Sequence, residues 1–109
     1  MFTGNINIAI LLLTRYAEIN AKDDEGKTPL HLACMLGNLA MVQRLMQRAD
    51  CMVNAQDNSG NTPLHVACNS LNEPIIRSIK MSNKADFGIL NNDHKKAADV
   101  LKYKAKQAG

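Results

Sequence analysis

A nine-residue string that returns once along the chain constrains the fold more than any other feature. Residues 26–34 read Gly-Lys-Thr-Pro-Leu-His-Leu-Ala-Cys, and residues 60–68 read Gly-Asn-Thr-Pro-Leu-His-Val-Ala-Cys. Asp23 and Asp57 stand three residues before the two glycines, so both copies obey one offset of 34 residues. Repetition at this period predicts a stack of small units with one continuous core, because a single unit cannot bury its apolar side alone.

Each copy carries the signals of a short helix. Thr28 and Thr62 have the side-chain oxygen that an N-cap requires, and proline follows where its missing N–H is not needed. Apolar and small residues then recur at positions i, i+3 and i+4, which predicts one apolar stripe that allows close packing. The stripes comprise Leu30, Ala33 and Cys34 in one copy, and Leu64, Ala67 and Cys68 in the other.

A second helix is predicted to follow each first one. Gly37 suits a left-handed C-cap, and Asn38 can cap the next helix. That helix has an apolar stripe of Met41, Val42, Leu45 and Met46. In the other copy Asn72 takes the cap position, while Leu71 replaces the glycine, so we expect this turn to be strained or rearranged. Each copy therefore predicts a helical hairpin.

The string Thr-Pro-Leu-His-x-Ala at this spacing resembles the ankyrin repeat. The resemblance is strong over residues 20–68 and weaker after residue 90, where His94 replaces the turn glycine and Asp99 the histidine. It implies an all-α ankyrin-repeat solenoid of stacked helix-turn-helix hairpins with short β-turn or hairpin connections. One domain over residues 1–109 would comprise the second helix of an incomplete repeat (1–22), two repeats (23–56 and 57–90) and a degenerate C-terminal capping repeat (91–109).

The charge pattern does not favour a polyanion as the main partner. The formal net charge is +3, and the lysines gather near the C-terminus. They are Lys95, Lys96, Lys102, Lys104 and Lys106. Because no aromatic stacking platform accompanies them, we interpret them as the solvated face of a terminal helix. A weak nucleic-acid contact through this lysine-rich helix remains an alternative.

Cysteine usage and apolar runs bear on location. None of the three cysteines lies at the C-x-x-C spacing of a zinc or redox motif, which indicates a reducing compartment. The longest apolar run, Ile8 to Leu13, is too short to span a bilayer, and the first five residues lack the positive charge of a secretory signal. We expect an intracellular protein, cytoplasmic or nuclear, without membrane contact.

No set of residues predicts catalysis. His31 and His65 share one repeat position, and the resemblance implies that they hydrogen-bond backbone near the turn. Cys34 and Cys68 replace a small core residue, so we expect Cys51, in a predicted loop, to be the more reactive thiol. No glycine-rich phosphate loop occurs. We therefore predict no enzyme activity, cofactor, metal site or small-molecule substrate.

The resemblance implies a non-enzymatic module that binds another protein, as a scaffold, adaptor or regulator, through a concave surface. Carried over by position, the hairpin tips and the exposed end of the first helix give the partner-binding set. It comprises Lys22, Asp24, Glu25, Lys27, Met35, Leu36, Gln56, Asn58, Ser59, Asn61, Asn69 and Ser70. An alternative is a structural end segment of a longer array. Apolar residues between Ile6 and Leu13 also predict self-association through an exposed N-terminal helix.

One modification site is predicted by the resemblance. Asn20, with Glu18 two residues and Leu12 eight residues before it, is similar to the target of an asparaginyl hydroxylase in ankyrin repeats.

Overall fold

The structure, a computed structural model, describes residues 19–108, so the helix expected within residues 1–22 lies almost wholly outside the described part. The described part holds five helices and no strand, which confirms the all-α prediction. In chain order they are α2 (Pro29–Leu36), α3 (Leu39–Met46), α4 (Pro63–Asn69), α5 (Glu73–Met81) and α6 (Ala97–Ala108).

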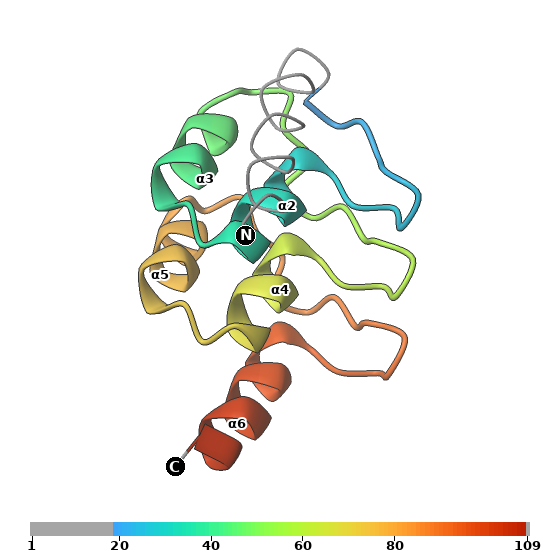
Figure 1. The fold of residues 1–109 in the computed structure, drawn as a ribbon, viewed down its shortest axis with the longest axis vertical. Coiled ribbons are helices and arrows are strands. Elements are labelled where there is room, and N and C mark those ends of the chain that lie inside the picture. Colours follow the sequence, from blue (N-terminus) through green and yellow to red (C-terminus); the bar gives the residue numbers. More distant parts are fainter. Residues whose placement is uncertain (1–18, 109) are drawn as a thin grey trace, which may run out of the picture.

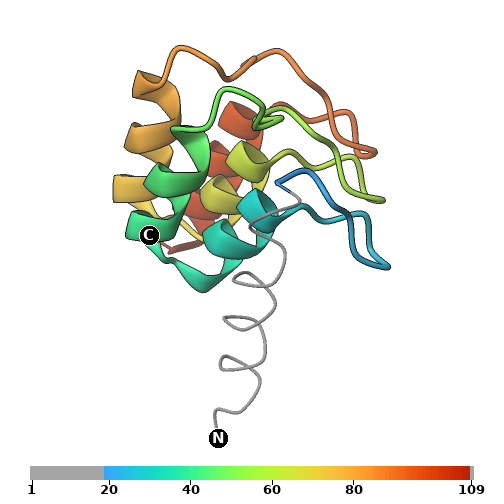
Figure 2. The same cartoon turned by 90° about the horizontal axis from the view of Figure 1, so that it is seen from above.

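The helices form two layers, with loops projecting from one side (Figure 1). Helices α2, α4 and α6 stack as an inner layer, and α3 and α5 pack behind them. Figure 2 shows three loops leaving the inner helices on the side away from α3 and α5. We call their turns, residues 23–27, 57–61 and 91–95, the fingers. Each finger is closed by a hydrogen bond of 2.9 or 3.0 Å between its first N–H and its last carbonyl.

The inner helices begin at the predicted threonine caps. In α2 the backbone N–H of His31 donates to Thr28 Oγ1, and the N–H of Thr28 donates to His31 Nδ1 at 3.1 Å. Thr62 and His65 form the same reciprocal pair at the start of α4. Two N–H groups that a helix start would leave unpaired are thus satisfied.

The same two imidazoles join each repeat to the next. His31 Nε2 lies 2.7 Å from the carbonyl oxygen of Asn61, and His65 Nε2 lies 2.9 Å from that of Lys95. Because Nδ1 accepts a backbone N–H and Nε2 faces a carbonyl oxygen, the ring must be neutral with its proton on Nε2. The implied structural role of both histidines is confirmed, and it extends across the boundary between repeats.

The fingers are held together by a ladder of asparagine contacts. The backbone N–H of Asn58 donates to the carbonyl of Glu25 at 2.9 Å, and its side chain donates to that of Asp24 at 3.1 Å. Asn92 repeats both bonds one finger further on, to Ser59 and Asn58, each at 3.0 Å. The ladder fixes the spacing of the three fingers.

This close approach requires glycine in the first two fingers. Gly26 and Gly60 have φ of 79°. A Cβ at either would lie 2.6 Å from the Oδ1 of the following asparagine, Asn58 or Asn92, which no real contact tolerates. His94 holds the third finger in the same left-handed turn, with φ of 61°, and its side chain is exposed.

Leu71 keeps the turn geometry of the glycine it replaces. Its φ is 56°, and the N–H groups of Leu71 and Asn72 donate to the carbonyls of Cys68 and Ala67. Gly37, with φ of 71°, and Asn38 make the equivalent pair of bonds. The turn is therefore strained rather than rearranged, and the strain costs about 1–2 kcal/mol.

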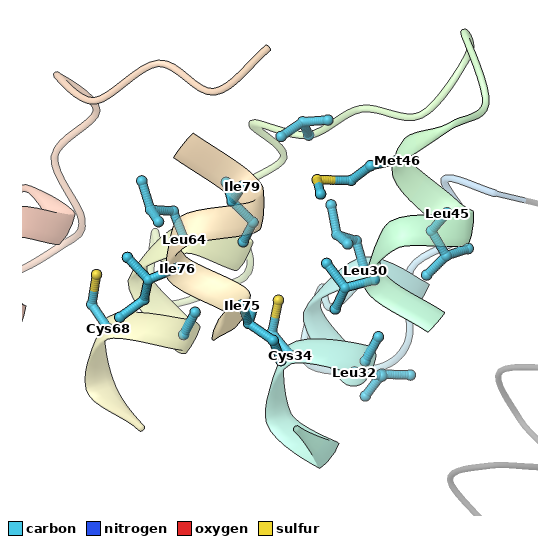
Figure 3. Close-up of a cluster of buried hydrophobic side chains, with 14 of the residues drawn as sticks. Leu30, Leu32, Cys34, Leu45, Met46, Leu64, Cys68, Ile75, Ile76 and Ile79 are labelled. Atoms are coloured by element: carbon cyan, nitrogen blue, oxygen red, sulfur yellow. The ribbon is translucent and has the colours of Figure 1, made fainter. Parts of the chain in front are cut away.

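The core lies between the two layers and is continuous along the stack (Figure 3). Leu30, Val42 and Leu45 of the predicted apolar stripes are at most 1% exposed, and so are Ile75 and Ile79 of α5. No buried side-chain nitrogen or oxygen in the described part lacks a hydrogen-bond partner. Stacking thus buries what one hairpin alone would expose, as the repeat predicted.

We predict that Gly60→Ala lowers the free energy of unfolding by at least about 2 kcal/mol, because alanine adds left-handed strain and a collision with Asn92. His94→Ala, at the same position of the third finger, is the matched control and should change it by less than about 0.5 kcal/mol. Urea unfolding followed by circular dichroism measures both. Equal losses in the two variants would contradict the close-approach argument.

We also predict that stability falls with acid through His31. Burial lowers the pKa of this imidazole below its ordinary value of 6.5. Below pH 6.5 the unfolded chain therefore takes up a proton that the folded chain resists, so the stabilisation is complete above pH 6.5 and declines toward the lower folded pKa. Urea unfolding from pH 7.5 to 5 should show this slope, and His31→Gln should reduce it. His94→Gln, which removes an exposed imidazole, is the control and should leave the slope in place.

Candidate functional site

A hollow of about 420 Å³ lies on the concave side, between the fingers and the inner helices. One side is formed by residues of all three fingers, and the other by residues of α2, α4 and α6. Its size is within the range of about 300–1,000 Å³ that is usual for clefts that receive ligands. We call this hollow the concave groove.

Equivalent side chains of the three inner helices form a row along the concave groove. Met35, Asn69 and Tyr103 are each 34 residues apart, and all three line the hollow. Met35 is 47% exposed and Tyr103 is 56% exposed, although both are large and partly apolar. A stack with one side chain per repeat therefore presents an accessible row with apolar groups at both ends.

Tyr103 was missed from the sequence, although a signal for it exists. The offset of 34 that relates Met35 to Asn69 leads directly to Tyr103. The repeat is eroded there, and the surrounding lysines were interpreted as a solvated face. The structure shows that this face includes an exposed aromatic ring, and that Val100 and Lys104 also line the concave groove.

Five of the twelve predicted partner-binding residues line the concave groove. They are Lys27, Met35, Ser59, Asn61 and Asn69. Of the rest, Lys22, Asp24, Glu25 and Ser70 are exposed outside it, whereas Leu36 is half-buried against the core.

Several predicted residues also hold the repeats together. Besides Asn58 in the ladder, Gln56 donates its side-chain amide to the carbonyls of Gly60 and Leu90 at 2.9 and 3.0 Å. Asn61 Oδ1 accepts the Asn91 amide at 3.0 Å. Substitutions at these positions would change stability and binding together, so they are poor probes of a binding surface.

Lys27 is an ion-pair partner within the fold. Its Nζ lies 2.9 Å from Glu25 and 3.5 Å from Asp57, and its side chain is only 17% exposed. The hydrogen bond to Glu25 raises the pKa of Lys27, against the opposing effect of burial, and Asp57 adds to the rise. Asp57 in turn accepts the N–H groups of Ser59 and Asn61. The lysine charge is thus largely neutralised inside the chain.

The three thiols are poorly suited to nucleophilic chemistry. Cys34 and Cys68 are buried in the core, as predicted, and Cys51 is half-buried. Burial raises the pKa of all three thiols, that of Cys68 to about 11, so little thiolate forms at neutral pH. Within residues 19–108 no group of three or more His, Cys, Asp or Glu side chains could hold a metal ion.

The side chain of Asn20, which precedes the first finger, contacts the loop that follows α3. Its side chain donates to the carbonyl of Asp50 at 2.7 Å and accepts the N–H of Met52 at 2.8 Å. Leu12 and Glu18, the other parts of the predicted hydroxylation motif, lie outside the described residues, as does the helix predicted to self-associate. Hydroxylation of Asn20 stays a prediction.

Stacked helical hairpins with a rigid inner layer and an open concave side define the class of helical-repeat solenoids. The chain belongs to the ankyrin-repeat family: the family model described as "Ankyrin repeats (3 copies)" matches residues 1–101. Ankyrin repeats generally mediate protein–protein interaction. The resemblance drawn from the repeated string is thereby confirmed.

Segments of larger proteins are similar to part of this chain. The Ankyrin repeat and LEM domain-containing protein 1 homolog of Caenorhabditis elegans is 48% identical over 44 residues, 40% of this chain and 6% of the relative. The SMC5-SMC6 complex localization factor protein 1 is 49% identical in Mus musculus and 46% in Homo sapiens, each over 41 residues, 38% of this chain and 4% of the relative. The chain thus matches only a small part of these relatives.

None of the helices in the described part combines the length and the apolar character needed to cross a membrane.

We predict that Cys51 reacts first with a thiol reagent at neutral pH, but more slowly than free cysteine, because burial has raised its pKa. Cys34 and Cys68 should react only as the fold opens. The release of thionitrobenzoate from Ellman's reagent measures the phases, and Cys51→Ala should remove the first. Persistence of that phase in Cys51→Ala would contradict the assignment.

Proposed function

We propose that this chain is a non-enzymatic protein-binding module whose partner occupies the concave groove. The observation that carries the proposal is the row of Met35, Asn69 and Tyr103, exposed at one repeat position. Large, partly apolar side chains that stay accessible are the groups that typically dominate the binding energy of an interface. Their spacing follows from the stack and needs no partner to form.

A preorganised frame supports this proposal. Helices α2 and α4 are each tied to the following finger by a buried imidazole, and each finger is tied to the next by an asparagine. Binding therefore requires little ordering of the backbone, which reduces the entropic cost of association. The polar side chains that make these contacts are already used within the fold. Met35, Asn69 and Tyr103 are not, so they are the groups best able to contact a partner.

The relatives add support for a protein as the partner. A segment of this chain is similar to proteins whose name describes the localization of the SMC5-SMC6 complex. We extend to this chain only the general role of binding a protein, and we propose an intracellular location, cytoplasmic or nuclear, with a scaffold or adaptor function.

We further propose that residues 91–108 act as a capping repeat. Asp99 accepts the N–H of Lys96 at 3.1 Å, as the histidines do for threonine, but it has no second ring nitrogen to reach a following finger. His94 places a Cβ where Gly26 and Gly60 leave room for the next asparagine. Both substitutions disfavour a further repeat in the same geometry, which argues against the alternative of a segment that merely continues an array.

We predict that a photo-crosslinking amino acid at Asn69 captures a partner in living cells, whereas the same group at Arg44, exposed on α3, does not. Met35→Glu should reduce the Asn69 adduct by about tenfold, because a charge replaces an apolar contact. Met81→Glu is the matched control, since Met81 is an exposed methionine of α5, outside the concave groove, and it should leave the adduct unchanged. Mass spectrometry of the adducts provides the measurement.

Circular dichroism first confirms that both variants remain folded. Equal adducts at Asn69 and Arg44, or equal losses in the two methionine variants, would count against the concave groove as the binding surface.

A further inference from the structure

We infer that the concave groove recognises an acidic peptide segment in which an aspartate or glutamate adjoins an aliphatic or aromatic side chain. This inference rests on the proposed function and adds the chemistry of the partner. It depends on how Lys27 and Lys95, which occupy the same position in the first and third fingers, differ in their surroundings.

The charge of Lys27 is neutralised by carboxylates of the fold, and that of Lys95 is not paired with a described residue. Lys27 contacts Glu25 in its own finger and Asp57 in the next finger. Lys95 has the same place in the third finger, yet it forms no ion pair with any residue from 19 to 108. Its backbone is fixed, because its N–H donates to Asn91 Oδ1 and its carbonyl accepts from His65. An exposed ammonium group is thus held on a rigid support.

A second cation faces the same space. Lys104 of α6 is half-buried, lines the concave groove together with Lys95, and likewise forms no ion pair with a described residue. Asp93, the acidic side chain of the third finger, also lines the concave groove and offsets one of these two positive charges. This end of the concave groove therefore has an excess positive charge that a carboxylate would complement.

Apolar groups share the lining of the concave groove with these cations. Val66 and Val100 are half-buried in the lining, and Tyr103 and Met35 are exposed along it. A carboxylate bound here would be partly screened from water by these groups, which strengthens its hydrogen bonds to ammonium. An apolar side chain next to the carboxylate would cover the ring of Tyr103 and the two valines. The two requirements together define the inferred motif.

The same residues disfavour a nucleic acid in the concave groove. A polyanion needs a continuous series of cations, whereas Asp57 and Asp93 interrupt the lining. Lys102 and Lys106 are exposed on α6, but they lie outside this hollow. Nucleic acid is therefore the competing outcome of the test.

The test begins with a library of random short peptides displayed on phage and selected on the full chain. Enriched sequences should contain an acidic residue next to an aliphatic or aromatic one. Fluorescence anisotropy of the best labelled peptide then compares the unchanged chain with Lys95→Glu/Lys104→Glu, which should weaken binding by about tenfold or more. The control Lys102→Glu/Lys106→Glu makes the same change in net charge and should weaken it by less than about threefold.

A charge swap isolates the electrostatic contact from loss of structure. The peptide with its acidic residue changed to lysine should bind the Lys95→Glu/Lys104→Glu variant better than it binds the unchanged chain. This exchange cannot result from misfolding, because a misfolded variant would not gain affinity for any peptide.

Other outcomes overturn the inference. They are enrichment of peptides without acidic residues, failure to enrich any sequence, equal effects of the two double variants, and stronger binding of a single-stranded oligonucleotide that depends on Lys102 and Lys106. If non-acidic peptides still lose affinity in Tyr103→Ala, the inference fails but the proposed function stands. If neither Tyr103→Ala nor Met35→Glu changes the affinity for the enriched peptides, the proposed function fails as well.

Discussion

A buried neutral imidazole between two repeats is the interaction on which the rest of this structure depends. Its Nδ1 completes the cap of its own helix, and its Nε2 reaches the backbone of the next finger, as at His31 and His65. An imidazole can accept at one nitrogen and donate at the other only when it is neutral, and at His31 burial favours that state by lowering the pKa. Helix start, repeat spacing and finger position are thereby set by one side chain.

The contacts that hold the repeats together also determine which residues remain available to bind a partner. Positions that carry the frame, such as Lys27, Asn58 and Asn61, use their charge or their hydrogen-bonding groups inside the chain. The row from Met35 to Tyr103 carries none of the contacts that join the repeats, so it can vary without loss of the stack. A repeat architecture of this kind separates the two tasks by position within the repeat.

Local features were predictable from the sequence, and contacts between repeats were less so. The threonine caps, the asparagine caps and the apolar stripes all act within four residues, and the structure confirms them. The sequence predicts that the turn at Leu71 is either strained or rearranged. The structure shows strain, because the N–H groups of Leu71 and Asn72 keep the same hydrogen bonds as in the glycine turn. Tyr103 is not predicted, because the motif around it is too eroded to make its offset of 34 from Asn69 obvious. Leu36, which the resemblance placed on the exposed end of its helix, packs against the core instead.

The sequence by itself determined the helical hairpins, their order and the apolar stripes that require stacking, since caps and periodicity act between neighbouring residues. The tertiary structure alone decided which polar side chains are free. Lys27 contacts a carboxylate of its own finger and a second one, Asp57, from a finger about 30 residues further along the chain, whereas Lys95 forms no ion pair with a described residue. Such contacts arise only when separate repeats are brought together at a fixed spacing, and the concave groove exists only in the stack.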